Sequence, residues 1–477
     1  DEENYLAALS ERLGRPLTDS EVFGFSQVNS EHCRHKIFNG TFIIDGKEMP
    51  SSLFGMIKKT SKENPGRLVS AYKDNVAFVK GPVVDQFYPE NPDKADYFTS
   101  RPVETVLSLK AETHNFPTTV EPFNGAATGS GGEIRDRLGG GKASLPLAGT
   151  AVYMTSYPRL DPRRRWELMM DPRVWLYQTP ADILIKASNG ASDFGNKFGQ
   201  PLICGSLLTF EHNEEGRVYA YDKVIMLAGG VGYAFAKDAI KGVPEPGQAV
   251  VLMGGDNYRI GMGGGAVSSV ATGQYDNAIE LNAVQRANPE MQKRVSNVIR
   301  AMAESENNPI VSIHDHGAGG HLNALSELVE ETGGHIDISA LPVGDPTLSA
   351  KEIIGNESQE RMGMVMKNED VDFVRRVADR ERSPMYVIGE TTGDHRFVFE
   401  LPDGSKPMNL EMSDMFGNPP KTVMRDVTVE RSYADCETEE SRLEEYLNDV
   451  LSLEAVACKD SVSYTHLRAH ETDSYLV

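Results

Sequence analysis

The feature that most constrains the fold is a glycine-rich stretch that follows an apolar strand and lies between two carboxylates. Residues 105–110 have the apolar, β-branched pattern of a buried strand, and residues 125–132 read GAATGSGG. Glu112 and Asp136 lie on either side of that stretch. Small residues allow a backbone to approach an anion closely and to point its N–H groups at it. The pattern predicts an anion-binding loop at the carboxyl end of a strand, where α/β folds place their chemistry.

The predicted phosphate loop has no Walker A spacing. Lys142 follows a glycine run but is itself followed by alanine, so GxxxxGK[ST] is not formed. The alternative is a flexible surface linker. The interleaved polar and apolar residues at 133–136 argue against a linker. The residues assigned to the loop are Gly125, Ala126, Ala127, Thr128, Gly129, Ser130, Gly131 and Gly132.

The segment between the strand and the glycines carries candidate ligands. Glu112 offers the carboxylate oxygen that Mg²⁺ prefers, and His114 shares its face if the strand continues. Alternatively this is a turn in which Thr113 and Asn115 satisfy nearby backbone groups.

Near the start of the chain, residues 29–36 read NSEHCRHK. His32 and His35 share a face if the segment is helical, with Cys33 between them. Structural zinc needs four ligands, and no second Cys/His pair is evident in the sequence. An acid/base or phosphate-contacting role is better supported by Arg34 and the lysine after His35, against the alternative of a solvated helix end.

The second half of the chain contains HDHGAGG at 314–320. On a strand, His314 and His316 share one face, as in a hydrolase metal site. Alternatively Asp315 is a Mg²⁺ ligand and the following glycines allow a close backbone approach. Residues 261–266 fit GxGxxA but follow too long a loop for a dinucleotide site, which favours a substrate loop. Residues 356–361 would by themselves be an exposed turn.

Composition excludes several classes of protein. The net charge of −22 argues against a nucleic-acid partner, which requires a basic surface. No apolar run is long enough for a membrane helix, and the acidic first residues do not resemble a secretory signal. The four cysteines are scattered without a CxxC pair, which favours a reducing, cytoplasmic setting.

Alternating strand and helix patterns predict an α/β chain with a junction at residues 244–247, PEPG. Helices are expected at 4–14, 18–29, 288–306, 320–332, 368–380 and 438–455. Strands are expected at 41–44, 76–79, 105–110, 249–253, 385–388 and 396–399, and the apolar runs at 182–185 and 223–227 keep the α/β rhythm. Residues 461–477 have no matching periodicity and are left out of the fold prediction.

Together, NSEHCRHK at 29–36, ETHNFPTTVEPFNGAATGSGGEIRD at 112–136, HDHGAGG at 314–320 and ESQER at 357–361 resemble phosphoribosylformylglycinamidine synthase. The resemblance covers about residues 1–459. It implies an aminoimidazole-ribonucleotide-synthetase-like α/β (α+β) fold, in which ATP lies between two subdomains. The implied parts are a helical linker at 1–40, an N-terminal subdomain at 41–243, a C-terminal subdomain at 244–430, the start of a second half at 431–459, and a non-native tail at 460–477.

The resemblance also implies an ATP-dependent ligase that phosphorylates an amide oxygen of formylglycinamide ribonucleotide, after which ammonia displaces phosphate. A glutaminase domain or subunit that nothing in this sequence matches would supply the ammonia. A metal-dependent hydrolase and a silent nucleotide-binding module remain alternatives. The implied catalytic residues are His32 and His114, and the implied Mg²⁺ ligands are Glu112, Asp136 and Asp315. The implied substrate contacts are Thr113, Asn115, Arg135, Gln285, Ser358 and Gln359.

Overall fold

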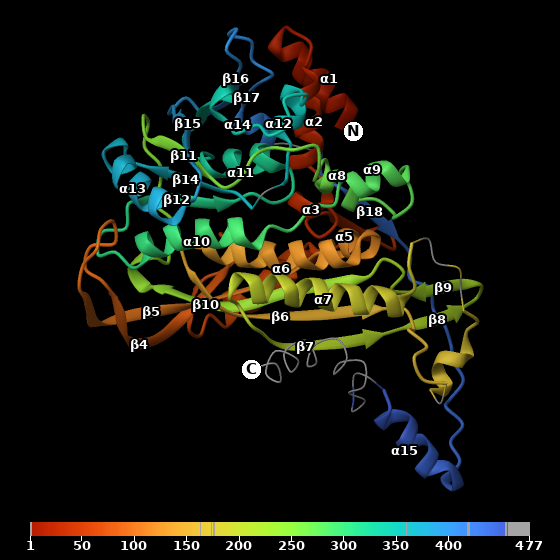
Figure 1. Cartoon of the computed structure of the whole chain (residues 1–477). Helices are drawn as coiled ribbons and strands as arrows, with labels where there is room; N and C mark the ends of the chain where they lie inside the picture. The colour runs from red at the N-terminus through yellow and green to blue at the C-terminus, as the bar shows by residue number, and fades with distance from the viewer. Residues whose placement is uncertain are drawn as a thin grey trace.

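The computed structural model describes residues 2–162, 164–172, 174, 177–358, 360–416, 420–453 and 456. The chain is an α/β protein built as two halves, each centred on a β-sheet, with helices packed between the sheets (Figure 1). The predicted fold class is confirmed. None of the described helices is both long and apolar enough to cross a membrane.

The first half contains a six-stranded sheet in the order β3-β4-β5-β10-β6-β7. Helices α6 and α7 lie between this sheet and the second half, beside α10 (Figure 1). The elements are β3 (Leu68–Ser70), β4 (Ala77–Pro89), β5 (Phe98–Thr113), α5 (Asn115–Val120), α6 (Pro122–Leu138), β6 (Leu145–Thr155), α7 (Pro180–Phe198), β7 (Leu202–Thr209) and β10 (Ile225–Phe235). The apolar run at 182–185 lies in α7, where Ile183 and Leu184 are buried.

The second half contains a seven-stranded sheet in the order β12-β14-β11-β15-β13-β16-β17. Its strands are β11 (Ala249–Met253), β12 (Ile310–Asp315), β13 (Gly334–Asp337), β14 (Met362–Met366), β15 (Met385–Thr391), β16 (Arg396–Glu400) and β17 (Met408–Glu411). Helices α10 (Pro289–Ala303) and α13 (Val371–Glu381) cover the face toward the first half, while α11 (Gly320–Leu328) and α12 (Ala350–Ile354) pack on the other face.

One hydrophobic core joins the two halves. Ile134 and Leu138 of α6 belong to the same buried cluster as Val298 and Met302 of α10. Burying apolar surface on both sides of a shared layer stabilises the halves as a unit. Residues at the inner ends of α6 and α10 are thereby held at fixed positions.

The N-terminal helices α1 (Glu2–Leu13) and α2 (Asp19–Val28) pack on the outer face of the second sheet, where Leu9 and Val28 join its core. The sequence TDSE forms the N-cap of α2. The Thr18 hydroxyl accepts the Glu21 N–H at 3.0 Å, and the Glu21 carboxylate accepts the Thr18 N–H at 2.9 Å. The following turn, α3 (Glu31–Arg34), carries His32 toward the junction of the halves.

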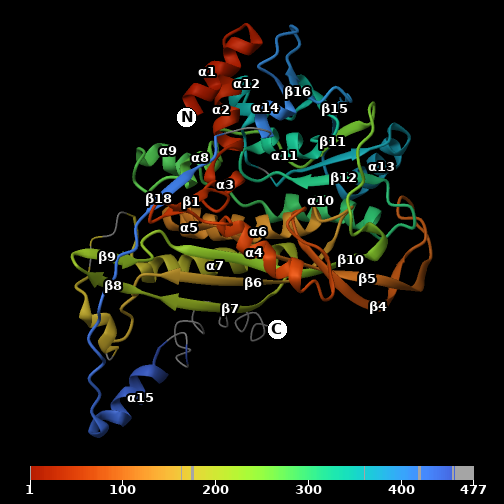
Figure 2. The same ribbon diagram turned by 180° about the vertical axis from the view of Figure 1, so that it is seen from behind.

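A strand late in the sequence pairs with a strand near its start. Strand β18 (Val423–Asp426) pairs in parallel with β1 (Thr41–Ile44) (Figure 2), and helix α4 (Leu53–Glu63) follows β1 in the chain. The remaining elements include β2 (Lys47–Glu48), β8 (Glu211–Glu214), β9 (Arg217–Ala220), α8 (Gly264–Ser268), α9 (Asn277–Asn282), α14 (Met412–Phe416) and α15 (Leu443–Leu451).

The glycine-rich stretch 125–132 is not a loop, so that prediction is wrong. It forms the middle of α6, and all eight residues are buried. A Cβ on Gly125 would meet the Pro117 carbonyl carbon at 2.3 Å, and one on Gly131 would meet the Phe194 ring at 2.6 Å. The glycines let α5 and α7 approach α6 closely. Because helical hydrogen bonds occupy the backbone N–H groups of this stretch, they are not free to cradle a phosphate.

Candidate functional site

Three acidic residues from separate elements meet where the two halves join. Glu112 lies near the end of β5, Asp136 on α6 and Asp315 at the end of β12. Lys110, two residues before Glu112 on the same face of β5, places its Nζ 3.0 Å from Asp136 Oδ2 and 3.8 Å from Glu112 Oε2. The fold thus brings together the three carboxylates singled out from the sequence. Their role as Mg²⁺ ligands stays a prediction.

The three acidic side chains of this cluster shift one another's pKa values. Burial, reinforced by the charge of Asp136, raises the pKa of Asp315 to about 6 and raises the pKa of Glu112 well above its usual range. Burial also disfavours ionisation of Asp136, but the charge of Lys110 and the hydrogen bonds with Glu112, Asn75 and Lys110 together outweigh it and lower the pKa of that carboxyl. Lys110 is the nearest cation to a site that gathers three acids.

Sequence reasoning missed Asn75, which lies in the loop before β4. Its Nδ2 donates to Asp136 Oδ1 at 3.0 Å and to Asp315 Oδ1 at 2.7 Å. The only signal in the sequence was a polar pair, Asp74 and Asn75, directly before a predicted strand. Such a pair is common in turns and did not distinguish this asparagine from others.

The donor set suits a hard divalent cation. The buried carboxylates of Asp136 and Asp315 and the half-buried carboxylate of Glu112 are the oxygen ligands that Mg²⁺ prefers. Among the described residues, no group of three His, Cys, Asp or Glu side chains has a ready metal-binding arrangement. Lys110 and Asn75 bind the carboxylates here, and a metal would have to compete with them.

His114 and His32 lie beside the carboxylates. The His114 ring packs on α6, where a Cβ on Gly129 would lie 3.0 Å from the ring atom Cγ. Burial, with the nearby charge of His32, lowers the pKa of His114 to about 4. Burial and His35 also lower the pKa of His32, although one side of that residue is open to solvent. Both rings are therefore neutral near pH 7 and able to accept protons.

Three other predicted substrate contacts have no described hydrogen bond to the carboxylates, although the charge of Arg135 reaches Asp315. Thr113 is exposed on the face of β5 opposite Glu112. The Oδ1 of Asn115 accepts the Met226 N–H at 3.1 Å. This side chain therefore satisfies a backbone group, as in the alternative interpretation of the segment. Arg135 is buried between α6 and α10, where its Nη1 donates to Gln292 Oε1 at 2.8 Å.

A second polar centre forms around Glu357, just before β14. This buried carboxylate accepts the Gly319 N–H at 2.8 Å, and it also bonds the Gly264 and Gly265 backbone and the Gln285 side chain. Burial raises its pKa to about 7. Glu357 therefore ties two glycine clusters together, a role that its sequence motif did not reveal.

The expected exposed turn at 356–361 is wrong, since every described residue in it is buried. Ser358 donates its hydroxyl to Asn356 Oδ1 at 2.7 Å, and it is 1% exposed. Gln359 lies outside the described residues. Asn356 in turn donates to the carbonyls of Tyr258 and Ile260. The motif thus fixes the loop that leads to α8.

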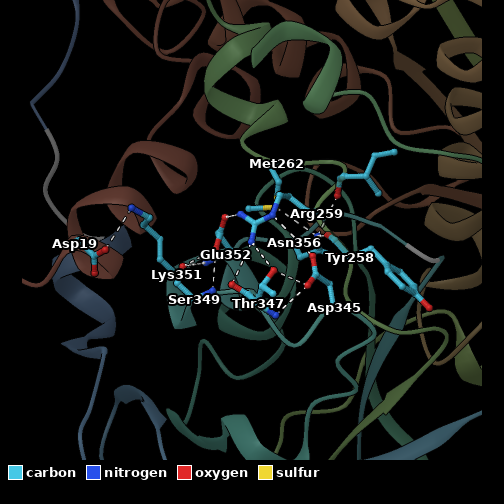
Figure 3. A network of polar contacts seen from close by, with 11 residues as sticks. Asp19, Tyr258, Arg259, Met262, Asp345, Thr347, Ser349, Lys351, Glu352 and Asn356 are labelled. Carbon is cyan, nitrogen blue, oxygen red and sulfur yellow. Dashed lines mark hydrogen bonds and ion pairs between the residues drawn. The ribbon is translucent and has the colours of Figure 1, made fainter. Parts of the chain in front are cut away.

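Figure 3 shows how the far side of that loop is held. Arg259 forms an ion pair with Glu352 of α12 and donates to the Thr347 carbonyl at 3.2 Å. Lys351, also on α12, lies 3.3 Å from Asp19 of α2. The loop at 254–262 is therefore anchored to the N-terminal helices as well as to Asn356.

The two histidines of the HDH sequence do not share a site. His314 Nε2 lies 2.6 Å from Glu327 Oε2, whereas His316 Nε2 lies 3.1 Å from His321 Nδ1 in the protein interior. Residue 316 follows the last residue of β12, so the strand alternation assumed from the sequence does not continue to it. The shared face of His314 and His316, which suggested a metal-dependent hydrolase, is therefore not formed.

Comparison with known proteins gives matches in both halves of the chain. Residues 245–402 match the family model "AIR synthase related protein, C-terminal domain", and residues 1–36 match "Formylglycinamide ribonucleotide amidotransferase linker domain". The structure of Thermotoga maritima PurL complexed with FGAR aligns with a TM-score of 0.62 at 23% identity, covering 92% of this chain and 59% of that one. The matched family model and the aligned structure define an AIR-synthase-related α/β fold.

Sequence similarity narrows the class further. The chain is 39% identical over 432 residues to phosphoribosylformylglycinamidine synthase of Dictyostelium discoideum, covering 88% of this chain and 32% of that protein. It is 39% identical over 469 residues to the Saccharomyces cerevisiae protein of the same name, covering 96% and 34%. This chain belongs with the phosphoribosylformylglycinamidine synthases, and it spans about a third of the length of these relatives.

Proposed function

We propose that this chain carries the synthetase centre of an ATP-dependent carbon–nitrogen ligase of de novo purine biosynthesis. The reaction joins formylglycinamide ribonucleotide and ammonia to give formylglycinamidine ribonucleotide, ADP and phosphate. The observation that carries the proposal is the convergence of Glu112, Asp136 and Asp315 beside two neutral histidines at the junction of the halves. The names of the two curated relatives and the FGAR complex of T. maritima PurL support the substrate.

ATP is proposed as the second substrate, since another structure of T. maritima PurL is complexed with ATP. Mg²⁺ held by the oxygens of Glu112, Asp136 and Asp315 would neutralise charge on the phosphoryl oxygens. Lys110 supplies a fixed cation at the same point, because its ammonium lies 3.0 Å from Asp136. Preorganised charges of this kind stabilise phosphoryl transfer without reorganisation of solvent.

The proposed chemistry has two steps. The carbonyl oxygen of the substrate attacks the γ-phosphorus, ADP leaves and the amide nitrogen gives up its proton, which gives an iminophosphate. Ammonia then attacks the same carbon, and phosphate leaves with the former carbonyl oxygen. His32 or His114 takes the proton that the attacking ammonia loses, because the lowered pKa of each ring leaves it neutral near pH 7.

The ammonia is proposed to come from glutamine through a glutaminase domain or subunit. The proposed setting is the cytoplasm, and the described cysteines Cys33, Cys204 and Cys436 are free thiols.

The test combines the chain with ATP, Mg²⁺, ammonium and formylglycinamide ribonucleotide, and measures ADP release. Release that depends on the ribonucleotide supports the ligase. ATP binding with no such release would indicate a silent nucleotide-binding module, and phosphoester hydrolysis without ATP would indicate a hydrolase.

A further inference from the structure

Asn75 connects carboxylates that belong to different halves of the molecule. Asp136 lies on α6 of the first half, and Asp315 ends β12 of the second. The Nδ2 of Asn75 donates to both, at 3.0 Å and 2.7 Å. Two buried acids on opposing surfaces repel each other, and an amide that donates to both offsets that repulsion.

The amide of Asn75 can adopt only one orientation. Its Oδ1 accepts from Lys241 Nζ at 3.0 Å, and an ammonium can only donate. The two carboxylates can only accept from Nδ2. Lys241 is itself held 2.6 Å from Asp74 Oδ1, and Asp74 Oδ2 accepts the Gly141 N–H at 2.7 Å. Flipping the amide would break all three contacts of the Asn75 side chain at once.

We propose that Asn75, oriented by Lys241, is the positioning residue of the divalent-cation site. It sets the spacing of Asp136 and Asp315 across the junction between the halves, so that both are in place when the cation arrives. This inference rests on the proposed function, because that function assigns the cation to these carboxylates. Residues that orient metal ligands typically change cation affinity when they are removed, even though they do not bind the metal.

The experiment compares Asn75→Ala and Lys241→Met with a matched control, Asn308→Ala. Asn308 also bonds across the halves, donating to the Lys142 carbonyl at 2.8 Å, but it has no described bond to the carboxylates. The probe is Mn²⁺ alone, titrated into each protein by calorimetry. The midpoint of thermal unfolding with and without Mn²⁺ is a second readout.

Asn75→Ala is expected to weaken Mn²⁺ binding by about tenfold, in the range found for residues that orient metal ligands. Lys241→Met should cause a smaller loss. The double variant should bind no more weakly than Asn75→Ala, because Lys241 acts through Asn75. Asn308→Ala should leave the affinity unchanged while lowering the unfolding midpoint.

Unchanged or tighter Mn²⁺ binding by Asn75→Ala would overturn the inference, as would an equal loss in Asn308→Ala. Should Asn75→Ala fail to fold, Lys241→Met decides, and an unchanged affinity in that variant overturns the inference. A parent chain that binds no Mn²⁺ overturns the cation assignment of the proposed function, and this inference with it.

Discussion

The Nε2 atom of His316 lies 3.1 Å from the Nδ1 atom of His321, and both imidazoles are buried. His321 Nε2 lies 3.1 Å from Asn257 Oδ1, which also accepts from Arg361. Because that oxygen only accepts, His321 donates from Nε2 and accepts from His316 at Nδ1. A neutral pair satisfies this chain of bonds, whereas a second proton on His321 would face the His316 N–H.

This pair predicts loss of stability in mild acid. Burial, together with the charge of Arg361, lowers the pKa of both His316 and His321 well below the unfolded value near 6.5. The unfolded chain therefore binds more protons below that pH. The stabilisation from the neutral histidine pair is fully present above about pH 6.5. As the pH drops below that value, the free energy of unfolding falls by up to about 1.4 kcal/mol per pH unit for each histidine.

Urea unfolding between pH 7.5 and about 5 measures the slope. His321→Gln should reduce the pH dependence, and His335→Gln on β13 serves as the control that leaves it unchanged. A free energy of unfolding that stays flat across this range in the parent chain would contradict the assignment.

Helix α6 gives a test of close packing. Gly125→Ala is expected to lower the free energy of unfolding by about 2 kcal/mol, because the new Cβ meets the Pro117 backbone at 2.3 Å. Intrinsic helix propensity alone predicts a gain of about 1 kcal/mol. Gly55→Ala in α4 is the matched control, since its nearest neighbour is the movable hydroxyl of Ser51, and it should be neutral or stabilising. A neutral Gly125→Ala would restore the loop interpretation.

Replacing the carboxylate of Glu112 by an amide distinguishes a role in cation binding from a role in packing. Glu112→Gln should reduce turnover by at least about a hundredfold, if Glu112 helps to hold the cation. The same variant should keep or raise the unfolding midpoint without divalent ions, because it relieves repulsion from Asp136. A lower midpoint with unchanged turnover would assign Glu112 a structural role only.

His32 is predicted to act in the chemical step. His32→Ala should reduce kcat by about a hundredfold or more, while the Kd for ATP stays within about threefold of the parent. His212→Ala, on the β8–β9 hairpin, should change neither quantity. Collapse of ATP affinity in His32→Ala would show that the ring binds nucleotide instead.

Local patterns predicted much of the fold. The capping box at Thr18, the long helix at α10 and the central strands follow from rules that act within a few residues. The glycine stretch was misassigned because glycine is common both in loops and at close helix contacts. Only the tertiary neighbours of α6, such as Phe194, distinguish the two.

The candidate site could be predicted only in part. Glu112 and Asp136 flank a conspicuous segment, so the sequence points to them directly. Asn75 joins Asp136 to Asp315 through contacts across 61 and 240 residues of chain, which no local pattern encodes. Ser358 looked like an exposed polar residue because the sequence does not show that Asn356 binds it in the interior.

The central claim is that ATP phosphorylates the substrate oxygen which ammonia then displaces. The most direct test uses formylglycinamide ribonucleotide labelled with oxygen-18 in the carbonyl that becomes the amidine, incubated with the chain, ATP, Mg²⁺ and ammonium. The account predicts that the label appears in the released inorganic phosphate, one labelled oxygen for each amidine formed. Amidine formation with unlabelled phosphate, or phosphate release without amidine, would contradict it.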